Sequence, residues 1–279
     1  MSLARRRAVD RAVRLGCVVA TAVAVVPLLS VLGYVVREGA GGLDLAFLTG
    51  LPKPVGEAGG GMGNAIVGTL TLLGMACLIG LPVGILAGVY LAEFGDRRLG
   101  KLVRFSADVM TGVPSIVVGL FVYALLVLSM RRFSAFAGSV ALAILMLPTV
   151  ARTTEELLRL VPGTLREAAL ALGVPQWRAT LKVVLRSAAP GVATGAMLAL
   201  ARAAGETAPL LFTAFNSRFW PQAVDQPIAS LPVQIFTYAV APYADWHRQA
   251  WAAALVLVAM VLVLNLAARL LTRQRPSGR

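Results

Sequence analysis

The chain has 279 residues, of which 58% are hydrophobic and only 14% are charged, whereas soluble domains carry about 25% charged residues. This composition is typical of an integral membrane protein and excludes an ordinary soluble domain. The formal net charge of +13 does not indicate a nucleic-acid-binding protein, because no soluble segment is long enough to gather the Lys and Arg residues on one folded surface.

Six apolar stretches are long enough to cross the roughly 30 Å hydrocarbon core of a bilayer as helices. They lie near residues 15–36, 65–94, 109–130, 137–150, 191–215 and 252–271. The first stretch exceeds the roughly 7 to 15 apolar residues of a secretory signal peptide, so we interpret it as an uncleaved span. The fourth is short and contains Pro148, so its boundaries are the least defined. The sequence predicts an all-α integral membrane protein with six transmembrane helices.

Glycines recur every four residues in the second stretch, as Gly80, Gly84 and Gly88. In a helix this spacing places the three glycines along one face, where a second helix can approach closely. We therefore expect this face to be a helix-packing surface.

Basic residues are unevenly distributed among the segments between the apolar stretches. The N-terminal tail, the loop 95–108, the segment 152–186 and the C-terminal tail with Arg273, Arg275 and Arg279 are strongly basic. The intervening loops 37–63, 131–136 and 216–248 carry few Lys or Arg residues. Because basic loops face the cytoplasm, both termini are predicted to be cytoplasmic.

The chain shows no complete motif for chemistry of its own. Residues 95–101 match the glycines and the lysine of a phosphate loop, but Leu102 replaces the Ser or Thr that would bind magnesium. The chain has one histidine, and neither Cys17 nor Cys77 belongs to a CxxC pair, so no metal-ligand or catalytic set can be assembled. We expect no catalytic residue, no metal and no cofactor, so energy for any transport would come from another chain.

The segment between the fourth and fifth stretches is too charged to span a membrane and predicts a short amphipathic helix. Pro162 and Gly163 indicate a turn, Thr164 is placed as an N-cap with Glu167 three residues later, and Gly173 ends the helix. The apolar positions at helical spacing are Leu165, Ala168, Ala169 and Leu172. Such a helix lies on the membrane surface or docks into a partner protein.

Glu167, Ala168 and Ala169, followed after three residues by Gly173, resemble the EAA motif of permease subunits of bacterial ABC importers. In that family the loop helix fits a groove on the ATPase subunit. The resemblance therefore implies that these four residues couple the chain to an ATPase. Gly173 is expected to be the most sensitive, because a side chain there would meet the turn or the partner.

The EAA motif usually continues to an aliphatic residue and then, after one residue, to Leu-Pro. Here Val183 and Leu185 occupy these places, but Arg186 replaces the proline. Four further strings are NAIVGTLTLLG from Asn64, GVPSIVVGLF from Gly112, LPTVARTTEELLRLVP from Leu147 and ARAAGETAPLLFTA from Ala201. Together they are similar to the PstA-type permeases of bacterial phosphate ABC transporters, from about residue 60 to the C-terminus.

The resemblance implies a type I ABC importer permease-like bundle in the bacterial cytoplasmic (inner) membrane. It implies one half of a pore, shared with a sister permease subunit and served by two copies of an ATP-binding subunit and a periplasmic phosphate-binding protein. The chain then divides into a cytoplasmic tail 1–14, a first transmembrane helix and periplasmic loop 15–63, a transmembrane domain 64–272 with an EAA loop near 155–187, and a tail 273–279.

Other functions stay open from the residues alone. A permease for another oxyanion, such as molybdate or sulfate, would share these features. A proton-driven secondary transporter would instead need intramembrane acid or histidine relays. Only Glu93, Asp108, Arg202 and Glu206 are candidates for intramembrane charges. A membrane scaffold without a transport role is the remaining alternative.

Arg202 and Glu206 are four residues apart and are therefore predicted to lie on one face of the fifth helix. A charge inside a span costs roughly 2.5 to 3.5 kcal/mol on insertion scales, so such residues face a pore or a partner. Either the pair is a structural ion pair, or Arg202 offers phosphate a cation along the substrate pathway while Glu206 orients it.

Overall fold

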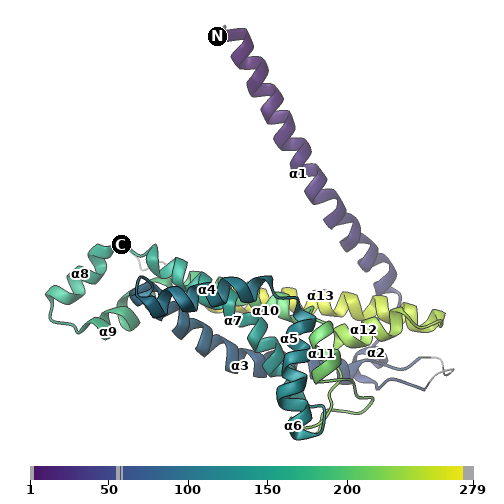
Figure 1. The fold of residues 1–279 in the computed structure, drawn as a ribbon. Coiled ribbons are helices and arrows are strands. Elements are labelled where there is room, and N and C mark those ends of the chain that lie inside the picture. The colour runs from purple at the N-terminus through teal and green to yellow at the C-terminus, as the bar shows by residue number, and fades with distance from the viewer. Residues whose placement is uncertain (1–2, 55–56, 58, 273–279) are drawn as a thin grey trace.

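The computed structural model describes residues 3–54, 57 and 59–272, and every regular element in these ranges is helical. The long helices are α1 (Leu3–Ala40), α3 (Gly63–Phe94), α7 (Ala135–Arg159), α10 (Leu185–Ala204) and α13 (Ala244–Thr272). The short ones are α2 (Leu45–Thr49), α4 (Arg98–Gly112), α5 (Ser115–Val122), α6 (Leu128–Met130), α8 (Gly163–Ala171), α9 (Gln176–Ala179), α11 (Ala208–Thr213) and α12 (Leu231–Ala239). Two π-helical segments, η1 (Tyr123–Val127) and η2 (Thr180–Val184), join α5 to α6 and α9 to α10 (Figure 1). The basic tail with Arg273, Arg275 and Arg279 lies outside the described residues.

Five of the described helical segments are long and apolar enough to cross a membrane, and a bent pair makes six if it counts as one span. This result confirms the all-α membrane class. The bent pair corrects the third predicted stretch, because Arg98–Gly112 and Ser115–Met130 meet at 107° instead of forming one straight helix. Pro114 explains the break: a residue before proline is driven out of the α region, and Val113 is extended, with ψ 128°.

The predicted limits of the fourth and fifth stretches are also corrected. α7 continues through Pro148 to Arg159, nine residues beyond the predicted end at 150. The fifth helical run extends over Gln176–Ala204, so it starts before the predicted residue 191 and ends before 215. Apolar content underestimates both helices because their ends near α8 carry charged residues, and in α7 Glu155 pairs with Arg104 of α4.

The bundle is centred on the contact between α3 and α7. A Cβ atom on Gly80 would lie 3.3 Å from Ala143, and one on Gly84 would lie 2.8 Å from Val150. At Gly88 it would lie 2.5 Å from Thr154. The missing side chains thus allow the two backbones to approach, which confirms the packing role predicted for the glycine spacing.

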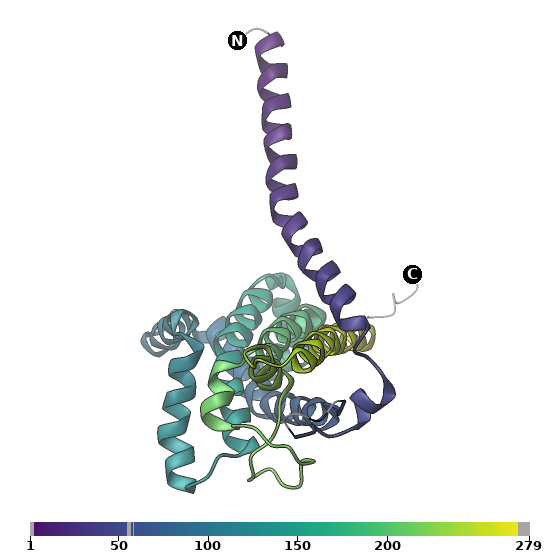
Figure 2. The same cartoon turned by 90° about the vertical axis from the view of Figure 1, so that its right-hand side faces the viewer.

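Helix α1 is attached to the bundle only near its C-terminal end, and the rest projects away from the bundle (Figures 1 and 2). Tyr34 packs edge-on against Trp251 of α13, with ring centroids 5.0 Å apart. A Cβ atom on Gly39 would lie 2.7 Å from the Trp251 carbonyl oxygen, so close contact continues into the last turn.

Helices α8 and α9 lie at one end of the bundle, and α2 and α12 lie towards the opposite end (Figure 1). The end of α3 belongs to the same end as α8, because Glu93 is paired with Arg166. Two of the basic segments recognised in the sequence, 95–108 and 152–186, are therefore brought together at this end.

Candidate functional site

The short helix α8 begins at Gly163, two residues earlier than an N-cap at Thr164 would predict. Pro162 occupies the N-cap position, where no side chain accepts a hydrogen bond, and Thr164 lies inside the first turn. The predicted N-cap at Thr164 is therefore wrong. The proline ring restricts φ, which is −55° at Pro162, while ψ is 133°, so this residue is itself non-helical and the helix begins directly after it.

The C-terminal end of α8 is closed by Gly173, as predicted. Its φ angle is +77°, a left-handed conformation that favours glycine. The Gly173 amide donates to the Leu170 carbonyl at 2.9 Å, and the Val174 amide donates to the Ala169 carbonyl at 3.1 Å. These two bonds form a Schellman motif, which satisfies carbonyls that a free helix end would leave unpaired.

The apolar residues of α8 divide between two directions. Ala169 is buried against the rest of the chain, whereas Leu165 is exposed and Leu172 is 84% exposed. Glu167 and Ala168 are also exposed. The structure thus brings the four motif residues onto one short helix and its terminal turn at the end of the bundle, with leucines presented outward.

A polar contact that the sequence did not predict joins α8 to α3. Arg166 Nη2 donates to Glu93 Oε1 at 2.6 Å, and Gln176 of α9 lies 3.5 Å from Glu93 Oε2. The Glu93 side chain is only 5% exposed. The sequence identified Glu93 only as a possible intramembrane charge, because its partner is 73 positions away.

A second buried carboxylate, Glu155 of α7, holds three arginines and is 2% exposed. Arg104 of α4 donates to it through Nε at 3.1 Å, Arg152 through Nη1 at 2.7 Å, and Arg159 pairs with it at 3.1 Å. Arg152 also pairs with Asp108 at 3.1 Å. This Glu155 cluster fastens α4 to α7. Its three- and four-residue spacings within α7 were visible in the sequence, but its link to α4 was not.

Arg202 and Glu206 do not share one helix face as predicted, because α10 ends at Ala204 and Gly205 is its C-cap. Glu206 lies in the irregular segment before α11. The two side chains still approach, with Arg202 Nε 3.8 Å from Glu206 Oε1. This pair is loose, since the Arg202 side chain is 63% exposed and that of Glu206 is 17% exposed.

The irregular segments before α5 and α11 are linked by packing of the two helices that follow them. A Cβ atom on Gly119 of α5 would lie 2.6 Å from the Pro209 Cα atom of α11. Non-helical backbone at membrane depth is tolerated where it is buried in protein or lines a water-filled cavity. The non-helical segment that holds Glu206 is therefore expected either to be buried in protein or to line a cavity.

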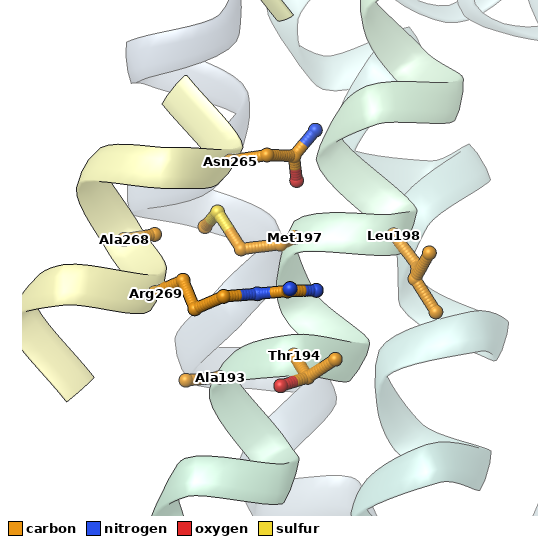
Figure 3. Close-up of a pocket in the computed structure, with 7 residues that line it drawn as sticks. All are labelled: Ala193, Thr194, Met197, Leu198, Asn265, Ala268 and Arg269. Atoms are coloured by element: carbon orange, nitrogen blue, oxygen red, sulfur yellow. The ribbon is translucent and has the colours of Figure 1, made fainter. Parts of the chain in front are cut away.

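A pocket of about 290 Å³ lies between α10 and α13 (Figure 3). Its polar lining comes from Thr194, Asn265 and Arg269, and the Arg269 side chain extends towards α10 (Figure 3). Arg202 and Glu206 are not among its lining residues, so this pocket is separate from the predicted pathway pair. Among the described residues, no three His, Cys, Asp or Glu side chains gather as metal ligands would.

The bundle has the fold of a membrane transport permease. It superimposes on a chain of a solved structure titled "Inward facing conformations of the MetNI methionine ABC transporter" with a TM-score of 0.60 and 21% identity, over 77% of this chain and 98% of that chain. A second crystal form of that transporter gives a TM-score of 0.58. At these identities the likeness concerns the fold alone.

Sequence relatives identify the family within this fold. Residues 80–275 match the model of the family described as "Binding-protein-dependent transport system inner membrane component". Proteins named phosphate transport system permease protein PstA are similar over most of the chain. The one from Yersinia pestis is 48% identical over 245 residues, covering 88% of this chain and 83% of its own, and one from Xylella fastidiosa is 49% identical over 238 residues, covering 85% and 83%. The chain belongs to this family and, within it, to the PstA permeases, which confirms the resemblance seen in the sequence.

Proposed function

We propose that this chain is a permease subunit of an ATP-driven phosphate importer and forms half of the translocation pathway beside a sister permease. Relatives named as phosphate permeases support the substrate. The structural observation that carries the proposal is α8, a short helix at one end of the bundle that is closed by Gly173 and presents Leu165 and Leu172 outward. A helix with exposed apolar residues suits insertion into a partner's groove.

Two copies of a separate ATP-binding subunit hydrolyse ATP in this proposal. One of them receives Glu167, Ala168 and Ala169 of α8 together with Gly173 in the turn that follows it. A periplasmic phosphate-binding protein delivers the substrate at the opposite end of the bundle. Both chain termini and α8 face the cytoplasm, because the basic segments 95–108 and 152–186 gather at the α8 end.

Arg202 offers the transported phosphate a cation along the pathway, and Glu206 orients that cation. The loose 3.8 Å pair and the exposure of Arg202 support this role, because a guanidinium that is not fully paired keeps donors for an oxyanion. The irregular backbone at Glu206 also supports it. The competing interpretation is a structural ion pair, in which Arg202 also complements the C-terminal dipole of α10.

Transport by the reconstituted complex tests the proposal. The chain is co-expressed with the sister permease and a tagged ATP-binding subunit, purified, and placed in liposomes with the phosphate-binding protein. We expect co-purification of the ATP-binding subunit and phosphate uptake that requires ATP. Uptake of molybdate or sulfate instead of phosphate would assign another oxyanion. Uptake driven by a proton gradient without the ATP-binding subunit would assign a secondary transporter. If the ATP-binding subunit does not co-purify and no uptake is measured, the remaining assignment is a membrane scaffold.

A further inference from the structure

The chain enters helix α8 from α7 and continues through α9 and η2 into α10, and Ala169 of α8 is buried. A polar contact adds a further link, in which Arg166 and Gln176 meet Glu93 in the last turn of α3. A single carboxylate therefore holds one residue from each of the two helices that flank the Gly173 turn.

The burial of Glu93 makes this contact persistent. Its side chain is 5% exposed, and that of Arg166 is 33% exposed. Separating a buried carboxylate from its arginine leaves an uncompensated charge, which costs more than the pair gains by forming. When α8 moves, the end of α3 is therefore expected to follow.

Apolar packing also links this part of α3 to the segment, since Val89 and Ala92 pack in one cluster with Val161 and Val184, but beside Glu93 a groove separates α3 from α9. A groove of about 420 Å³ lies between α3 and α9, and Glu93 and Gln176 belong to its lining. Its apolar lining comes from Val89, Phe94, Trp177 and Leu181. Because the two helices leave this space between them, the polar contacts at Glu93 span the separation.

Movement of α3 passes directly into the centre of the bundle. The α3 face with Gly84 and Gly88 lies in backbone contact with α7, and tightly packed interfaces transmit displacement with little slack. From α7, the Glu155 cluster continues the connection to α4. A mechanical path thus leads from α8 through α3 and α7 to the bent α4–α5 pair.

We propose that Glu93 and Arg166 form a strut that transmits movement of α8 to α3 and so couples ATP hydrolysis to the substrate pathway. They are positioning residues, since neither is required to touch substrate or nucleotide. The inference rests on the proposed function, in which α8 is the helix that the ATP-binding subunit moves.

Charge-removing variants of the assembled complex test the strut. Glu93→Gln and Arg166→Gln are purified with the sister permease and the ATP-binding subunit, and ATP hydrolysis is measured with and without the phosphate-binding protein loaded with inorganic phosphate. We expect the ATP-binding subunit to co-purify and basal hydrolysis to persist, while stimulation by the loaded binding protein falls about tenfold, within the range of mutations along coupling networks. The exchanged variant, Glu93→Arg with Arg166→Glu, is expected to recover most of the stimulation.

Lys182→Gln is the matched control, because Lys182 is an exposed cation on the same cytoplasmic segment. Its stimulation should equal that of the unchanged protein. If the stimulation of ATP hydrolysis falls by less than about twofold in both single variants, the inference is overturned. Loss of the ATP-binding subunit from the complex also overturns it, since the pair would then serve docking. If the phosphate-loaded binding protein does not stimulate ATP hydrolysis by the unchanged complex, the proposed function itself is contradicted. This measurement is made before any variant is compared.

Discussion

The conformation of Gly173, and not a lack of space within the chain, restricts side chains at this position. Its φ is +77°, and a Cβ atom there would have no neighbour within 4 Å. A side chain there would therefore not meet the turn within this chain, and contact with a partner stays a prediction. Most L-residues pay about 1–2 kcal/mol for the left-handed region, and aspartate adopts it more readily.

A Gly173→Asp variant separates contact with a partner from backbone strain. We expect it to enter the membrane normally but to lose association with the ATP-binding subunit or substrate-dependent hydrolysis, because the added carboxylate lies at the turn that is proposed to meet that subunit, whereas Gly163 lies at the other end of α8. Gly163→Asp is the control: a Cβ atom at Gly163 also has no neighbour within 4 Å, and an acid suits a helix N-terminus. Co-purification measures the effect, and unchanged coupling in Gly173→Asp would leave a helix that lies on the membrane surface.

The loose pair of Arg202 and Glu206 leads to a second prediction at the residue scale. Arg202→Gln should abolish phosphate uptake while the complex still assembles, because the pathway loses its cation. A structural pair predicts loss of assembly instead. In the exchanged variant, Arg202→Glu with Glu206→Arg, the cation moves from the end of α10 into the irregular segment beyond it. Near-normal uptake by this variant in liposomes would contradict the pathway role.

Among the helices, the α4–α7 contact depends on one buried carboxylate. Glu155→Gln should lower the free energy of unfolding by about 2–3 kcal/mol, since it removes the carboxylate charge that pairs with Arg104, Arg152 and Arg159 and leaves only Asp108 for Arg152. The partly exposed arginines keep the cost at or below the lower end of the range for buried pairs. Glu156→Gln, at the exposed neighbouring position, should change stability by less than about 0.5 kcal/mol. Thermal unfolding in detergent compares the two, and equal stabilities would remove the proposed role of the cluster.

For the whole molecule, the gathering of basic segments at one end predicts its orientation in the membrane. A single cysteine in place of Arg178, on a background lacking Cys17 and Cys77, should be labelled only by reagents that reach the cytoplasm. A cysteine in place of Phe219, an exposed residue of the segment between α11 and α12, should be labelled from outside. Labelling of position 178 from outside alone would reverse the orientation.

The sequence by itself determined the features that depend on local spacing. Long apolar stretches must become helices in a bilayer, because hydrocarbon leaves backbone groups no other partners. The four-residue spacing from Gly80 to Gly88 predicted the face of α3 that packs on α7, and Gly173 predicted the end of α8. The motif residues 167–169 and 173 were likewise found together on one short element because they are close in the chain.

Only the tertiary structure decided which distant charges meet and how far the helices extend. Glu93 and Arg166 are 73 positions apart, and Arg104 and Glu155 are 51 apart, so no local period relates them. The pairing of Glu155 lets α7 carry charged residues well past the apolar stretch that predicted it, and the fifth helical run likewise begins before its apolar stretch. The helix break at Gly205 likewise places Arg202 on α10 and Glu206 on the irregular segment after it. This break could not be predicted because helix ends depend on packing with neighbouring helices as well as on local composition.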